Sequence, residues 1–109
     1  MRIYDGSFDR QGNSMVTVDD KPLSPRFDLY NHSPTGFAWG YEGSGPAQLA
    51  LAILADCAGD RLALMHYQEF KRRVIATFDQ ERGFTLTSEQ VNDHIDAIIA
   101  ASLVKGERS

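Results

Sequence analysis

The chain has 109 residues, 42% of them hydrophobic, with eleven Lys and Arg against fifteen Asp and Glu and a formal net charge of −4. That length holds one hydrophobic core and excludes a second, and the mildly acidic balance excludes a general attraction to nucleic acid or anionic membranes. A single cysteine excludes an intramolecular disulfide, and no apolar run is long enough to span a bilayer. No basic and apolar leader opens the sequence, so we expect one cytoplasmic domain over residues 1–109.

Residues 1–43 are expected to form short strands and turns. Strands are predicted at Arg2–Tyr4 and Met15–Val18, and the Asp19-Asp20 pair after the second is typical of a hairpin turn. Alternating hydrophobic and polar residues predict a further, half-buried strand at Arg26–Tyr30.

An aromatic segment then precedes the first helix. In Phe37–Tyr41 the side chains of Phe37, Trp39 and Tyr41 fall at every second position, which predicts a strand with all three on one face. The loop before it, Asn31–Gly36, is rich in residues that favour turns.

Residues 44–109 are expected to be mostly helical, with one short strand near 84–86. The first helix should occupy about 46–58, because Pro46 suits the first helical position and Gly59 suits the position after the last turn. Small or apolar side chains cover all its faces, so we expect it to be central and buried.

Two more helices should follow. One begins near Asp60 and carries an apolar stripe that includes Leu64 and Phe70. The other opens with Thr87 and Gln90 in a capping box. The sequence therefore predicts an α+β fold, in which a small, mainly antiparallel sheet packs against three helices.

The glycine-rich stretch GYEGSGP, from Gly40 to Pro46, is a candidate phosphate loop at a helix start. Its glycine spacing matches neither the dinucleotide fingerprint nor the P-loop, Pro46 removes one amide donor, and Glu42 would repel an anion. A structural turn, capped at Ser44, is the favoured interpretation.

No catalytic, metal or cofactor site is predicted. The three histidines, His32, His66 and His94, lack metal-ligand spacing. Cys57 lies near a helix C-terminus beside Asp56, and both features raise the pKa of a thiol, which is typical of an inert cysteine. We therefore expect a protein that is not an enzyme.

Two charged groups are open to two interpretations each. Lys71, Arg72 and Arg73 form either a patch for a phosphate backbone or an acidic partner, or a solvated helix face. Asp19 and Asp20 belong to a set of acidic turns that either keep the domain soluble or meet a basic partner.

The motifs NHSPTGF, WGY and GSGPAQLA, all within residues 31–50, are followed later by YQEFKRRVIATF and GFTLT. With these motifs the chain resembles, over roughly residues 23–100, a family of small bacterial proteins of unknown function that also occurs in phages and plasmids. The resemblance implies no activity, but it implies a role connected with mobile elements or host defence. Glu42 departs from the small residue, often Gly, expected at its position, which further weakens a phosphate site.

Three functional hypotheses follow. The first is a non-enzymatic interaction protein of a phage or plasmid, an inhibitor of a host-defence or nucleic-acid-processing complex, whose contact groups are Asp19 and Asp20 or Lys71–Arg73. The second is a small-ligand or nucleotide-binding module that uses the Gly43–Gln48 turn, with Trp39 or Tyr41 stacking on a base and Gly43, Ser44 and Gly45 at the ligand. The third is nucleic-acid binding through Lys71–Arg73. We expect no membrane partner.

Overall fold

A computed structural model describes residues 1–108, with side chains described as far as residue 103. The strands are β1 (Ile3–Phe8), β2 (Ser14–Val18), β3 (Lys21–Pro22) and β4 (Phe84–Thr87). The helices are α1 (Ser44–Ala58), α2 (Asp60–Arg73), the short 3-10 helix η1 (Ile75–Thr77) and α3 (Ser88–Arg108).

The strands form one antiparallel sheet in the order β3-β2-β1-β4. One face carries the buried side chains of Tyr4, Val16 and Leu86 and packs against α1. The other carries alternate residues such as Asp5 and the exposed Met15, and no described helix covers it. The α+β prediction is confirmed.

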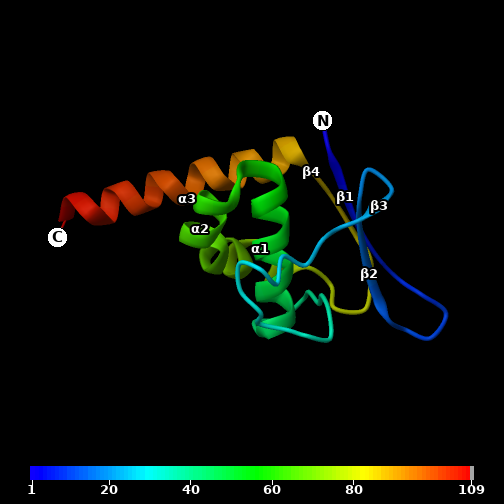
Figure 1. Ribbon diagram of the computed structural model, residues 1–109. Coiled ribbons are helices and arrows are strands. Elements are labelled where there is room, and N and C mark those ends of the chain that lie inside the picture. The colour runs from blue at the N-terminus through cyan, green and yellow to red at the C-terminus, as the bar shows by residue number, and fades with distance from the viewer. Residues whose placement is uncertain (109) are drawn as a thin grey trace.

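Helix α1 lies between the sheet and α2, and α3 runs directly on from β4 and extends past the rest of the molecule (Figure 1). Every residue from Gly45 to Ala55 is buried, which confirms the prediction of a central helix. The helix begins at Ser44 rather than near Pro46, and it ends, as predicted, before Gly59. The predicted cap at Ser44 is wrong, because the N-cap is Gly43 and no side chain caps it.

Local signals were reliable at two other boundaries. Asp19 and Asp20 have φ values of 50° and 66° and join β2 to β3 in a two-residue turn, as the mirror-image hairpin turns require. At the start of α3 the Thr87 hydroxyl accepts the Gln90 amide at 3.2 Å, and the Gln90 side chain accepts the Thr87 amide at 2.9 Å. The capping box is confirmed.

Two predicted strands are wrong. Arg26–Tyr30 is a turn in which Arg26 has φ of 56° and its guanidinium binds Asp28 and Asp60, so the backbone folds back instead of extending. Phe37–Tyr41 pairs with no strand in the described chain. Its aromatic side chains differ in exposure, because Trp39 is buried and Tyr41 is 41% exposed.

Two further expectations need correction. β1 runs to Phe8, four residues beyond the predicted Arg2–Tyr4, because residues 4–8 pair with β2 across the whole strand. Leu64 does not belong to the core: it is 45% exposed, since the buried face of α2 is made by Ala63 and Phe70.

Candidate functional site

The glycines between Gly40 and Gly45 are explained by close packing. Gly40 has φ of +88°, and a Cβ there would lie 2.5 Å from the Cα of Gln80. The ring of Tyr41 lies over the turn, so a Cβ at Gly43 would lie 2.7 Å from that ring. A Cβ at Gly45 would lie 2.7 Å from the Cβ of Ala38. The absence of side chains at these glycines therefore lets the Tyr41 ring pack over residues 43–45. It also lets the 79–82 turn pack against Gly40, just before α1.

The same packing closes the start of α1. Gly45, Pro46 and Ala47 are buried, and the Tyr41 hydroxyl lies above Gly45. Glu42 is adjacent, 3.9 Å from the Nζ of Lys71. Gly45 is therefore buried, Gly43 is half-buried and Ser44 is exposed, and the carboxylate of Glu42 lies beside them, which disfavours an anion at this turn.

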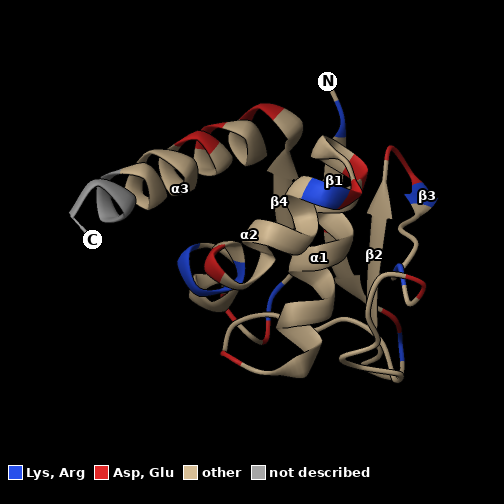
Figure 2. Cartoon of the chain, turned by 60° about the vertical axis from the view of Figure 1, so that its left-hand side comes forward, with Lys and Arg blue, Asp and Glu red and all other residues tan. Residues whose placement is uncertain are grey.

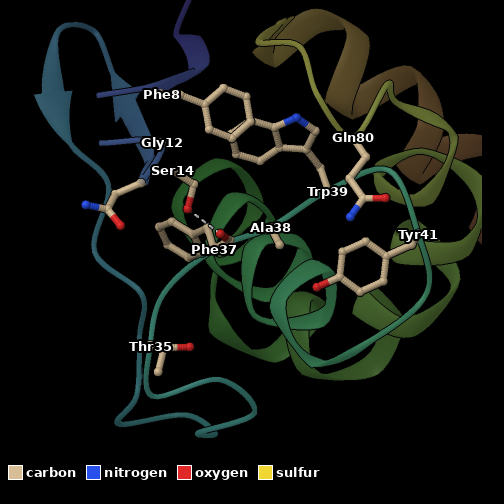
Figure 3. A pocket seen from close by; sticks show the side chains of 10 residues that line it. Phe8, Gly12, Ser14, Thr35, Phe37, Ala38, Trp39, Tyr41 and Gln80 are labelled. Atoms are coloured by element: carbon tan, nitrogen blue, oxygen red, sulfur yellow. Dashed lines mark hydrogen bonds between the residues drawn. The ribbon is translucent and has the colours of Figure 1, made fainter. Parts of the chain in front are cut away.

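An aromatic pocket of about 390 Å³ lies beside this turn (Figure 3). Its lining comes from three parts of the chain: the end of β1 and the hairpin loop after it, the 35–41 segment, and the 79–82 turn. The side chains that line it are Phe8, Asn13, Ser14, Thr35, Phe37, Ala38, Trp39, Tyr41 and Gln80, with the backbone of Gly12.

Trp39 forms the floor of this aromatic pocket. Its indole N–H donates to the carbonyl oxygen of Arg82 at 2.7 Å. Its ring packs between Phe8 and Phe84, with centroids 5.2 and 5.0 Å away. Of the two aromatic residues named from the sequence, Trp39 is therefore buried in the floor, where its ring is covered by Phe8 and Phe84. Tyr41 remains partly exposed at the mouth of the pocket.

Gln48 fixes the loop that leads into the pocket. This fully buried amide accepts the backbone N–H groups of His32 and Ser33 at 2.7 and 3.2 Å and donates to the carbonyl oxygens of Pro25 and Tyr30 at 2.6 and 3.0 Å. One side chain of α1 thus replaces the strand pairing that residues 25–33 lack. The sequence signal was the polar residue inside the apolar run of α1.

A second aromatic and polar group joins this loop to α2. The Nε2 atom of His32 lies 2.7 Å from the Tyr67 hydroxyl, and its ring stacks on Tyr30 at 4.2 Å. Burial, together with the positive charge of Lys71, lowers the pKa of His32. This environment favours the neutral form of the His32 imidazole, which packs between Tyr30 and Tyr67.

The charged candidates have defined partners. Asp19 accepts the Ile3 amide at 2.9 Å, so it closes the hairpin onto β1. Arg72 and Arg73 share the carboxylate of Glu69, at 2.6 and 3.0 Å, which lowers the pKa of Glu69. Lys71 is turned inward, with only 13% of its side chain exposed.

The exposed face of α2 is apolar at its centre. Met65 is 67% exposed and stands between two hollows, of about 330 and 520 Å³, both of which it lines with His66. Ile98 and Ala101 of α3 form the far wall of the smaller hollow. Leu103, 65% exposed, follows on the projecting part of α3. The apolar stripe predicted for this helix from its spacing did not include Met65, and no role was predicted for that residue.

Cys57 belongs to a structural cluster at the end of α1. Asp56 accepts hydrogen bonds from Tyr4, at 2.7 Å, and from Arg2, which ties β1 to the helix. Burial, and to a smaller extent Asp56, raises the pKa of the Cys57 thiol, in the predicted direction. Among the described residues no three His, Cys, Asp or Glu side chains lie close enough together to hold a metal ion.

The sequence profile of a family of unknown function, DUF6166, matches residues 4–97. The chain belongs to this family. No curated protein and no solved structure matches it. Membership in DUF6166 assigns no role to any residue. The match covers both the aromatic pocket and α2, and no helix among residues 1–108 has the length and apolar character needed to cross a membrane.

Proposed function

We propose that this DUF6166 protein is a non-enzymatic interaction module that binds a protein partner through the exposed face of α2 and the adjoining part of α3. The observation that carries the proposal is Met65, a large flexible apolar side chain with two-thirds of its surface in water and a hollow on each side. Its neighbour Leu64 is also 45% exposed, and large exposed apolar side chains that lie together are candidates for an interaction site, where methionine adapts its shape to a partner.

The rim of this face is basic, which defines the partner. Residues 60–73 contain four basic side chains and two acidic ones, a surplus of two positive charges (Figure 2). Arg61 lines the larger hollow and Arg73 lines the smaller one, and arginine is enriched in protein interfaces. The face therefore suits a protein surface with an apolar side chain at its centre and a carboxylate that reaches the exposed Arg61.

A nucleic-acid partner is less well matched to the same residues. Phosphate contacts need several free cationic side chains. Lys71 is covered and lies near Glu42, and Arg72 and Arg73 are engaged by Glu69. These pairings leave little of the Lys71–Arg73 charge for a phosphate backbone.

The setting that we propose is the one implied by the resemblance over roughly residues 23–100: a phage or plasmid protein that acts in the host cytoplasm and occupies a surface of a host-defence or nucleic-acid-processing complex. Support for this setting is the sequence resemblance alone. The α2 face would make the contact with that complex, because an inhibitor that only covers a surface needs no catalytic residues.

A matched pair of charge substitutions tests the proposal. Met65→Glu places a carboxylate at the centre of the face, and Met15→Glu places one on the open face of the sheet, at a side chain 48% exposed. With a photo-crosslinker at Leu64, we expect one host protein to be captured by the wild type and by Met15→Glu, and lost with Met65→Glu.

Capture that is equal in all three proteins would refute the α2 face. Capture that depends on nuclease-sensitive material would support a nucleic-acid partner instead. A salt titration separates the two further, because a protein partner with an apolar contact should lose much less affinity than one held by phosphate contacts.

A further inference from the structure

The aromatic pocket beside the glycine turn is separate from the α2 face and shares no lining residue with its hollows. Its volume, about 390 Å³, lies within the roughly 300–1,000 Å³ of small-ligand sites. Three of its aromatic side chains, Phe8, Phe37 and Tyr41, retain exposed surface around the mouth. Figure 3 shows Phe8 beside Trp39, with Phe37 and Tyr41 on other sides of the opening.

The polar groups of the pocket are all uncharged. Asn13 and Gln80 contribute amides, Thr35 contributes a hydroxyl, and all three residues are exposed. Two of the lining polar groups have partners within the chain: the Ser14 hydroxyl donates to the Phe37 carbonyl oxygen, and the Asn13 amide nitrogen donates to Asp9 at 3.2 Å. No Lys, Arg, His, Asp or Glu is among the residues that line the pocket. A phosphate or carboxylate would find no opposite charge there, and an ammonium would find none either.

We infer that this pocket binds a planar, uncharged heterocycle of the nucleobase class, presented as a free nucleoside. Aromatic side chains stack on every base because each base has a π face. Amide side chains match the paired donors and acceptors on base edges. Tyr41 is the stacking residue, since Trp39 is held between Phe8 and Phe84 with its N–H bonded.

Trp39 makes the test direct, because it is the only tryptophan of the chain and it lines the pocket. Its fluorescence should change saturably when the full-length protein is titrated with adenosine, cytidine or uridine. Adenosine 5′-monophosphate should bind no more tightly than adenosine. Tighter binding of the monophosphate would overturn the uncharged class, and binding of a short single-stranded oligonucleotide without any response to nucleosides would overturn a free-nucleoside ligand.

Variants locate the binding. Tyr41→Ala should weaken the nucleoside roughly fivefold or more, the usual loss for one base-stacking aromatic residue. Because Tyr41 also packs over the glycine turn, Gln80→Ala is the second variant: it changes an exposed side chain and should weaken binding without altering the unfolding midpoint. Gln68→Ala on α2, outside the pocket, is the control.

Absence of a saturable response to every nucleoside would overturn the inference, as would equal affinity in Tyr41→Ala, Gln80→Ala and Gln68→Ala. Neither result would bear on the α2 face, because the partner-capture test with Met65→Glu reads out different residues. The two proposals therefore fail independently.

Discussion

Gln48 offers the sharpest test of how α1 organises the region around the pocket. Gln48→Met keeps the length of the side chain and removes its polar atoms, so four backbone groups of residues 25–33 lose their partner. A typical intramolecular hydrogen bond contributes about 1 kcal/mol net. The four together predict a loss of about 4 kcal/mol in the free energy of unfolding, and a fall of roughly 20 °C in the unfolding temperature.

Urea denaturation, followed by circular dichroism and by Trp39 fluorescence, measures this loss. Gln90→Met is the matched control, because Gln90 is exposed and its side chain accepts only the Thr87 amide. We expect the control to lose about 1 kcal/mol or less. Hydrogen exchange adds a local measurement, since the His32 and Ser33 amides should lose protection only in Gln48→Met. A loss at Gln48 no larger than that at Gln90 would refute the reasoning.

Three further predictions concern single residues. Thr87→Ala should lower the free energy of unfolding by about 1 kcal/mol, because it removes the cap of α3; an unchanged denaturation midpoint would contradict this. Asp20→Gly should raise it by up to about 1 kcal/mol, since glycine adopts φ of 66° more readily than aspartate, and destabilisation would show that the Asp20 side chain matters more than its backbone. The lowered pKa of His32 means that the unfolded chain binds the proton more readily, so stability should fall as the pH drops through and below the ordinary histidine value of about 6.5. His32→Gln should flatten this decline, and an identical decline in the variant would assign it to other groups.

The elements that could be predicted are those whose signal is local. The capping box at Thr87 and the paired aspartates of the hairpin each involve residues at most three positions apart, so the sequence contains both partners. The burial of α1 follows from its all-round apolar composition. Each of these features needs no knowledge of the rest of the fold.

The errors have a common physical cause. Arg26–Tyr30 and Phe37–Tyr41 alternate like strands, but their backbones are held by groups distant in sequence. Gln48 takes the hydrogen bonds of the first segment, and Gly40 places the second against the 79–82 turn. The prediction for Leu64 failed for a related reason. Helical spacing groups residues on one face, but it does not determine which face of α2 packs against the neighbouring elements.

Two residues of the aromatic pocket were named from the sequence. Trp39 and Tyr41 line one pocket, and the stacking of a base on either of them stays a prediction. Phe8 and Gln80 complete the pocket from segments about 30 and 40 residues away from this pair, and no spacing rule connects them. Tertiary structure alone brings them together, so only a structure could reveal that the pocket is uncharged.

The glycine-rich stretch from Gly40 to Gln48 is the most distinctive part of the sequence, and its residues are explained mainly by packing and hydrogen bonds within the fold. Gly40, Gly43 and Gly45 make room for Tyr41 and Gln80, and Gln48 satisfies a loop, so these residues are needed by the fold whether or not the protein binds anything. A residue that the fold does not need is better placed to report on function. Met65 is better placed in this sense, because two-thirds of its side chain lies in water and a polar substitution there should change the stability of the folded chain little. Loss of partner capture in Met65→Glu with an unchanged unfolding midpoint would therefore report on function and not on folding.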